Sequence, residues 1–110
     1  MSEESLDRTL LALADPNRRR VVDLLCERPR RAGELAELTR LAFPAMSRHL
    51  RALRESGLVE EDRHEGDSRV RIYRLRQEPM TELKGWLEQT EKMWARQLVA
   101  FKAHLQKSRK

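Results

Sequence analysis

Residues 43–57 read FPAMSRHLRALRESG, and this stretch decides the fold. Met46, Leu50 and Leu53 recur at spacings of four and three residues. That spacing is typical of a helix with one buried face, which we place at residues 44–56. Gly57 is expected to end the helix, because a glycine after the last turn readily takes a positive φ. The face opposite the apolar residues is polar and carries Ser47, Arg48, Arg51 and Arg54.

Three shorter helices are predicted before this one. Leu6, Leu10 and Leu13 share one helical face within residues 1–14. Asp15 and Pro16 are typical of the cap and first residue of a second helix, which we expect to end near residue 27. The arginines at 18–20, near its start, are interpreted as facing a partner or solvent. Residues 28–31 read as a breaker, and a third helix is expected over about 32–39.

A basic hairpin and a long helix are predicted after residue 57. In residues 69–75, arginines alternate with β-branched residues, which is typical of a strand, and Gly66-Asp67 marks a turn. Residues 58–76 are therefore expected to form a hairpin, here termed the wing. The final helix, residues 79–106, carries an apolar stripe that so small a domain cannot cover. We expect part of this stripe to pack against another chain.

Length and composition exclude several classes of protein. The 110 residues suit one domain, 1–110, and 39% of them are hydrophobic. No stretch of about 18 apolar residues is present, which argues against a membrane span. The acidic residues within 1–14 do not resemble a secretory signal. A single cysteine, Cys26, excludes an intramolecular disulfide and fits a reducing cytoplasm, so we expect a cytoplasmic protein.

Arginine dominates the positive charge. The net charge is +5, and arginine supplies 18 of the 23 basic residues. Its planar fork matches phosphates and guanine edges in a bidentate manner, so the composition favours nucleic acid as a partner, although a solvated basic surface has the same composition. No glycine-rich phosphate loop is present, and no nucleophile–base motif joins Cys26 to the three histidines. We therefore expect no enzymatic activity and no cofactor.

The order of these elements predicts a winged helix-turn-helix, a mainly α fold with five helices and a small β-hairpin. The major groove of B-DNA is about 12 Å wide and admits one helix, while a β-ribbon reaches the adjacent backbone. Double-stranded DNA is accordingly the expected partner of residues 44–56 and the wing. A winged-helix module that binds a protein through its last helix is the alternative.

The chain resembles the ArsR/SmtB family of bacterial repressors over roughly residues 8–76. The resemblance rests on ALADPNRR at 12–19, GELA at 33–36, MSRHLRALRESGLV at 46–59 and YRL at 73–75. The later segments GWL at 85–87 and WARQL at 94–98 are similar to an autorepressor subgroup that lacks a metal site. The resemblance implies a homodimeric, cytoplasmic transcriptional repressor whose first and last helices form the dimer interface.

The resemblance also implies which side chains contact DNA. Arg48 is the candidate for a bidentate guanine contact, worth about 1–3 kcal/mol of discrimination. The predicted DNA-binding set is Phe43, Pro44, Ser47, Arg48 and Arg51 in the helix, with Ser68, Arg69 and Arg71 in the wing. The predicted dimer interface consists of Leu6, Leu10, Leu13, Leu83, Trp86, Leu87, Trp94, Leu98 and Phe101. The helix at residues 44–56 is here termed the recognition helix, and two-fold symmetry would set its two copies about 34 Å apart on an inverted repeat.

The sequence departs from the family pattern in the turn before the recognition helix. Ala42 stands where a serine or threonine normally caps that helix, and Arg40 replaces the usual glycine, so we expect an unfavourable φ at Arg40.

The metal-ligand positions of the family are mostly filled by residues that cannot bind a metal. They fall on Arg31 and Gly33 for one site and on Glu91, Met93, His104 and Lys107 for the other, so no metal site is expected. Cys26 is expected to be a small buried hydrophobe. A metal- or redox-responsive repressor is the alternative within the DNA-binding class, and the sequence identifies no inducer.

Overall fold

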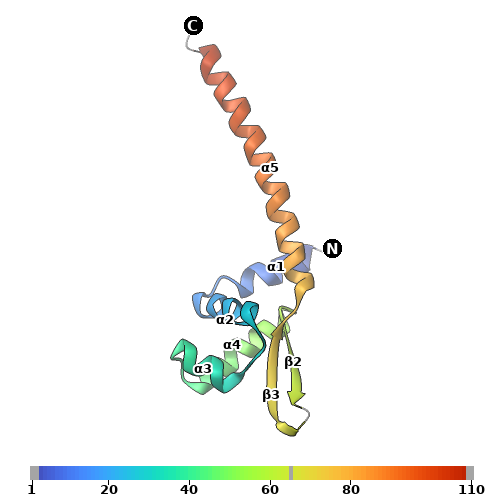
Figure 1. Ribbon diagram of the computed structural model, residues 1–110. Coiled ribbons are helices and arrows are strands. Elements are labelled where there is room, and N and C mark those ends of the chain that lie inside the picture. Colours follow the sequence, from blue (N-terminus) through green and yellow to red (C-terminus); the bar gives the residue numbers. More distant parts are fainter. Residues whose placement is uncertain (1–2, 65, 109–110) are drawn as a thin grey trace.

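The computed structural model describes residues 3–64 and 66–108. Within them the chain forms five helices and three strands. In chain order these are α1 (Glu3–Ala12), α2 (Pro16–Glu27), β1 (Arg30–Arg31), α3 (Ala32–Thr39), α4 (Phe43–Glu55), β2 (Val59–His64), β3 (Asp67–Leu75) and α5 (Gln77–Ser108). Helices α1–α4 and the sheet form a head, from which α5 projects alone (Figure 1). The molecule therefore measures 74 × 29 × 22 Å.

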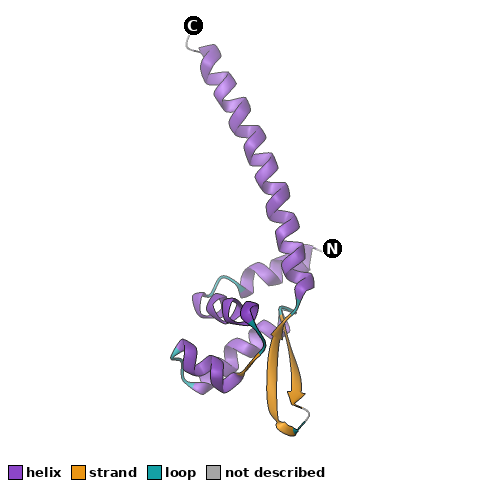
Figure 2. Ribbon diagram, in the orientation of Figure 1, coloured by secondary structure: helices purple, strands orange, loops and turns teal. Residues whose placement is uncertain are grey.

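The sheet has one strand more than the sequence predicted. Its three antiparallel strands lie in the order β1-β3-β2, with the β2–β3 ribbon extending beyond the helices (Figure 2). In β1, Arg30 and Arg31 pair with Tyr73 and Ile72. The prediction that residues 28–31 interrupt regular structure was wrong at Arg30 and Arg31. A strand of two residues is too short to show an alternating sequence pattern, and it forms only because β3, far along the chain, pairs with it. Pro29 is compatible with it because it precedes the strand.

The core lies where α2, α3 and α4 meet the sheet. The predicted apolar face of α4 is confirmed, since Met46, Leu50 and Leu53 are at most 2% exposed. Leu58, Val59 and Tyr73 of the wing and Leu35 of α3 complete this core, together with Ala12, Val21, Val22 and Leu25.

Cys26 is exposed, so the prediction that it is buried was wrong. It follows the buried Leu25 by about 100° of helical rotation and lies outside the face that α2 turns to the core.

The arginine run at the start of α2 binds the ends of neighbouring helices. Nε of Arg18 donates a hydrogen bond to the carbonyl of Ala12 at 2.6 Å, and Arg20 donates to the carbonyl of Leu38 at 3.0 Å. Arg19 similarly binds the chain just after α1. The last carbonyls of a helix lack partners within it, so these contacts satisfy them. The run is thus explained within the chain, and no partner is needed to account for it.

Helix α5 joins the head only through its first turns. Pro79 is buried, Met80 packs against the core, and Ser5 of α1 donates a hydrogen bond to Glu82 at 3.0 Å. From Gly85 to Ser108 every residue is exposed. Despite its 32 residues, α5 carries too many charges to cross a bilayer, and no other described helix is long and apolar enough to do so.

Candidate nucleic-acid interface

The turn between α3 and α4 sets the direction of the polar helix. Arg40 ends α3 with φ 59° and ψ 30°, and it is the one non-glycine residue with positive φ in the described parts of the chain. The N–H groups of Arg40 and Leu41 donate to the carbonyls of Glu37 and Ala36 at 3.2 and 3.1 Å, which closes α3. The unfavourable φ expected at Arg40 is confirmed, and it costs about 1 kcal/mol in a residue that carries a Cβ.

Helix α4 begins without a side-chain cap. Ala42 occupies the cap position with extended backbone and gives no side-chain hydrogen bond, as expected from the sequence. The helix begins at Phe43, one residue before its predicted start, with Pro44 in the first turn. Phe43 is 56% exposed and Pro44 is also exposed, so the N-terminal end of α4 is accessible to solvent.

The outer face of α4 combines exposure with uncompensated positive charge. Ser47, Arg48 and Arg51 are exposed, on the side opposite the buried Met46 and Leu50. Within residues 3–64 and 66–108, the side chains of Arg48 and Arg51 form no hydrogen bond and no ion pair. Their guanidinium groups are therefore available to an external anion or base edge.

The wing carries arginines that are compensated by carboxylates of the neighbouring strand. Arg71 lies 2.9 Å from Glu61, and Arg74 forms ion pairs with Glu60 at 3.4 Å and with Asp62. The predicted wing residue Arg69 is exposed. The backbone of Ser68 belongs to β3, but its side chain lies outside the described part of the structure.

Glu61 connects the wing to α4, a role that the sequence analysis missed. One of its carboxylate oxygens lies 2.9 Å from Arg71 and the other lies 2.9 Å from Arg54 of α4. Burial and the Glu61 carboxylate raise the pKa of Tyr73, the residue paired with Glu61 across the strands. A signal was present, because Glu61, Tyr73 and Arg71 lie on one face once the register of the hairpin is known.

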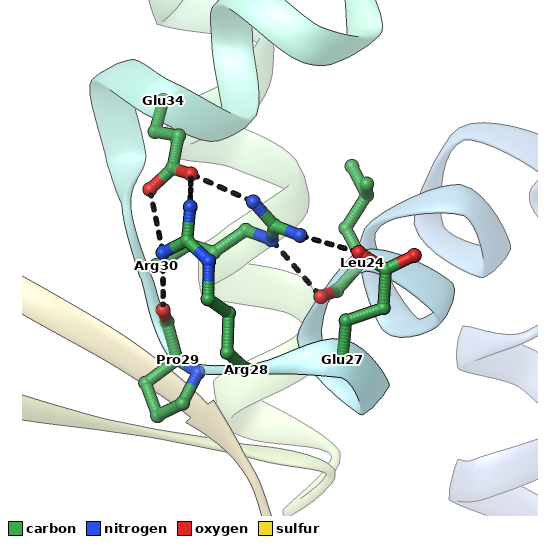
Figure 3. Close-up of polar contacts among 6 residues, drawn as sticks. All are labelled: Leu24, Glu27, Arg28, Pro29, Arg30 and Glu34. Carbon is green, nitrogen blue, oxygen red and sulfur yellow. Dashed lines mark hydrogen bonds and ion pairs between the residues drawn. The ribbon is translucent and has the colours of Figure 1, made fainter.

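Arg30 holds the first turn of α3, the helix that precedes the turn to α4. Although it is charged, Arg30 is only 7% exposed, and its guanidinium binds the Leu24 carbonyl at 3.0 Å, Glu34 at 2.7 Å and Glu27 at 2.6 Å (Figure 3). Arg28 binds the same Glu34 from the exposed side. Burial acts to raise the pKa of Glu34, but hydrogen bonds from both arginines hold it below its usual value. This cluster holds the end of α2, β1 and the first turn of α3 together.

A second surface, on α5 and α1, is apolar. Trp86, Leu87, Trp94, Leu98 and Phe101 are between 41% and 61% exposed. Leu10 of α1 is 39% exposed, whereas Leu6, Leu13 and Leu83 are half-buried, with Leu13 packed against the core of its own chain. The structure thus leaves most of the predicted interface residues uncovered in a single chain.

The metal-ligand positions considered from the sequence do not come together. In the described residues, no group of three or more histidine, cysteine, aspartate or glutamate side chains is placed to bind a metal ion.

Comparisons with known proteins agree with this geometry. A family model described as "Bacterial regulatory protein, arsR family" matches residues 15–61. The chain is 37% identical over 97 residues to the HTH-type transcriptional regulator Rv2034 of Mycobacterium tuberculosis, covering 88% of this chain and 85% of that protein. It is 35% identical over 52 residues to the transcriptional repressor SdpR of Bacillus subtilis, covering 47% of this chain and 58% of that protein.

The fold also matches a solved structure. The crystal structure of an ArsR family transcriptional regulator has a TM-score of 0.75 at 32% identity, covering 86% of this chain and 95% of that chain. The predicted resemblance and the predicted winged helix-turn-helix fold are both confirmed.

Proposed function

Since the chain belongs to the ArsR family of bacterial regulatory proteins and is a DNA-binding transcriptional regulator, we propose that it represses transcription as a homodimer bound to an inverted-repeat operator. Its family is one of regulators rather than enzymes. SdpR, one of its relatives, is named a transcriptional repressor. Repression is then steric, because the bound dimer occupies the promoter.

The observation that carries the proposal is the free charge on α4. Arg54, Arg71 and Arg74 are each held by a carboxylate, whereas Arg48 and Arg51 have no partner in the described residues. Both face away from the core on a helix that fits a major groove. In this arrangement Arg48 reads a guanine edge and Arg51 neutralises a phosphate.

The exposed apolar stripe of α5 supports the homodimer. Large hydrophobic side chains recur from Trp86 to Leu105, on the part of α5 that projects from the head and is exposed throughout. An apolar patch of this extent on a free-standing helix is unusual for a monomer. In the proposed dimer, two α5 helices pack side by side with α1 at their base, and the two α4 helices face one duplex.

Substitution of Arg48 tests the reading of DNA sequence. Duplexes are first selected from a random library with the wild-type protein, and affinities for the selected and a scrambled duplex are then measured. We expect R48A to weaken binding to the selected duplex roughly 5- to 150-fold, with a small effect on the scrambled one. R96A, on the projecting part of α5, removes the same charge and serves as the control. An unchanged ratio of the two affinities in R48A would contradict the assignment.

A further inference from the structure

We infer that Glu61 is a positioning residue for DNA binding, because its carboxylate joins Arg54 of α4 and Arg71 of the wing into one bridge. The inference rests on the proposed function and adds to it the element that fixes the two DNA-contacting parts relative to each other. In this view the recognition helix and the wing approach a duplex as one rigid surface.

The register of the hairpin puts Glu61 on the face of the wing that turns toward the core. Glu61 is paired with Tyr73, and the next pair on the same face toward α5 joins Val59 to Leu75. Val59 and Tyr73 are buried in the core, while Leu75 packs against it. The side chain of Glu61 is accordingly only 12% exposed, although it is charged. A carboxylate in such a place is expected to be paired.

The two arginines divide the carboxylate between them. Arg71 approaches Oε1 and Arg54 approaches Oε2, each at 2.9 Å, and the contact with Arg54 is an ion pair without hydrogen-bond geometry. Their side chains remain 47% and 51% exposed, so each fork keeps N–H groups for an external phosphate. The trio has a net charge of +1, and its cations are the parts that reach solvent.

The carboxylate of Glu61 has two opposing effects on DNA binding. Its negative charge disfavours nearby phosphates, as any acidic residue on this surface would. It also orders two long side chains before DNA arrives, and ordering such a side chain during binding reduces affinity appreciably. Because the charge of Glu61 is largely buried and shared by two arginines, we expect the ordering effect to be the larger one.

Glu60, the adjacent residue of β2, provides a matched control. It lies on the opposite face of the ribbon, where it pairs with Arg74, and its side chain is 49% exposed. Ion pairs this exposed contribute little order. E60Q and E61Q therefore remove the same charge from the same strand, but only E61Q removes the bridge between α4 and the wing.

The test compares the affinities of E61Q, E60Q and wild type for one selected duplex, at one salt concentration. We expect E60Q to bind as tightly as wild type or slightly more tightly. We expect E61Q to bind about 10-fold more weakly than E60Q, from the loss of order in two arginines. E61Q binding as tightly as E60Q, or more tightly, would overturn the inference. The ion pairs of Glu61 with the two arginines would then not strengthen DNA binding. Failure of the wild type to select any duplex would instead refute the proposed function.

A double-mutant cycle separates positioning from a general loss of structure. In an R71A background half of the bridge is already absent, so the further effect of E61Q on affinity is expected to shrink to a few-fold. An undiminished effect would contradict the inference. Thermal unfolding is measured for each variant. Where E61Q does not fold, E61D and E60D are compared instead, because they keep the charge and shorten the reach by one methylene, and equal affinities of these two would be the contrary result.

Discussion

Replacement of Arg30 by methionine is expected to destabilise the head by about 2 kcal/mol. The hydrogen bond to the Leu24 carbonyl contributes about 1 kcal/mol, and the pairing with Glu34, which is 29% exposed, contributes about the same. The pairing with Glu27 adds little, because the side chain of Glu27 is 69% exposed. Methionine retains most of the buried volume, so the change mainly removes polar contacts.

Chemical and thermal denaturation, both at a fixed protein concentration, measure this effect. A loss of about 2 kcal/mol corresponds to a fall in Tm of roughly 8 °C for a chain of this size. Arg28→Met is the matched control, because Arg28 binds the same Glu34 but is 58% exposed, and its replacement is expected to cost less than about 0.5 kcal/mol. An Arg30→Met protein as stable as wild type would refute the reasoning. It would mean that the free-energy cost of burying the charge of Arg30 equals the contribution of its polar contacts, as is found for some buried ion pairs.

Three further outcomes are expected. Arg40→Gly raises the unfolding free energy by up to about 1 kcal/mol, because glycine takes φ 59° without strain. Chemical denaturation measures this change, and a lower unfolding free energy would be the contrary result. Trp94→Glu converts dimers to monomers in sedimentation, whereas Lys92→Glu on the same helix does not. Burial acts to raise the pKa of Glu34, but hydrogen bonds from Arg30 and Arg28 hold it below its usual value, so the pairing stabilises the fold above the unfolded-state pKa and is lost as pH falls through the lower folded-state pKa. The unfolding free energy of Glu34→Gln, measured in denaturant across this acid range, is therefore expected to depend less on pH than that of wild type.

The helical core was predictable because its signals are local. Asp15 and Pro16 mark the start of α2, Gly57 has φ 83° after α4, and the four-three spacing of Met46, Leu50 and Leu53 places the buried face. Each signal depends on residues within one or two turns of each other. The free arginines of α4 followed from the same periodicity, since they occupy the face opposite the core.

The remaining features depend on contacts between distant segments. β1 exists because β3 lies beside it, and Arg30 is buried because Glu27, Glu34 and the end of α2 meet around it. The arginines of the wing read alike in sequence, yet Arg71 and Arg74 are compensated by β2, which becomes apparent only from the register of the hairpin. The number of positive charges alone therefore overestimates how many arginines lack a carboxylate partner within the chain.

The central claim is that two copies of the chain present their α4 helices to one duplex, with Arg48 reading its sequence. The most direct measurement is selection of binding sites from a random duplex library by wild type and by R48A, with the number of chains bound per selected duplex determined. We expect wild type to select an inverted repeat with half-sites about 10 base pairs apart, bound by two chains, and R48A to lose one guanine preference in each half. A single half-site bound by one chain, or the same motif selected by both proteins, would contradict it.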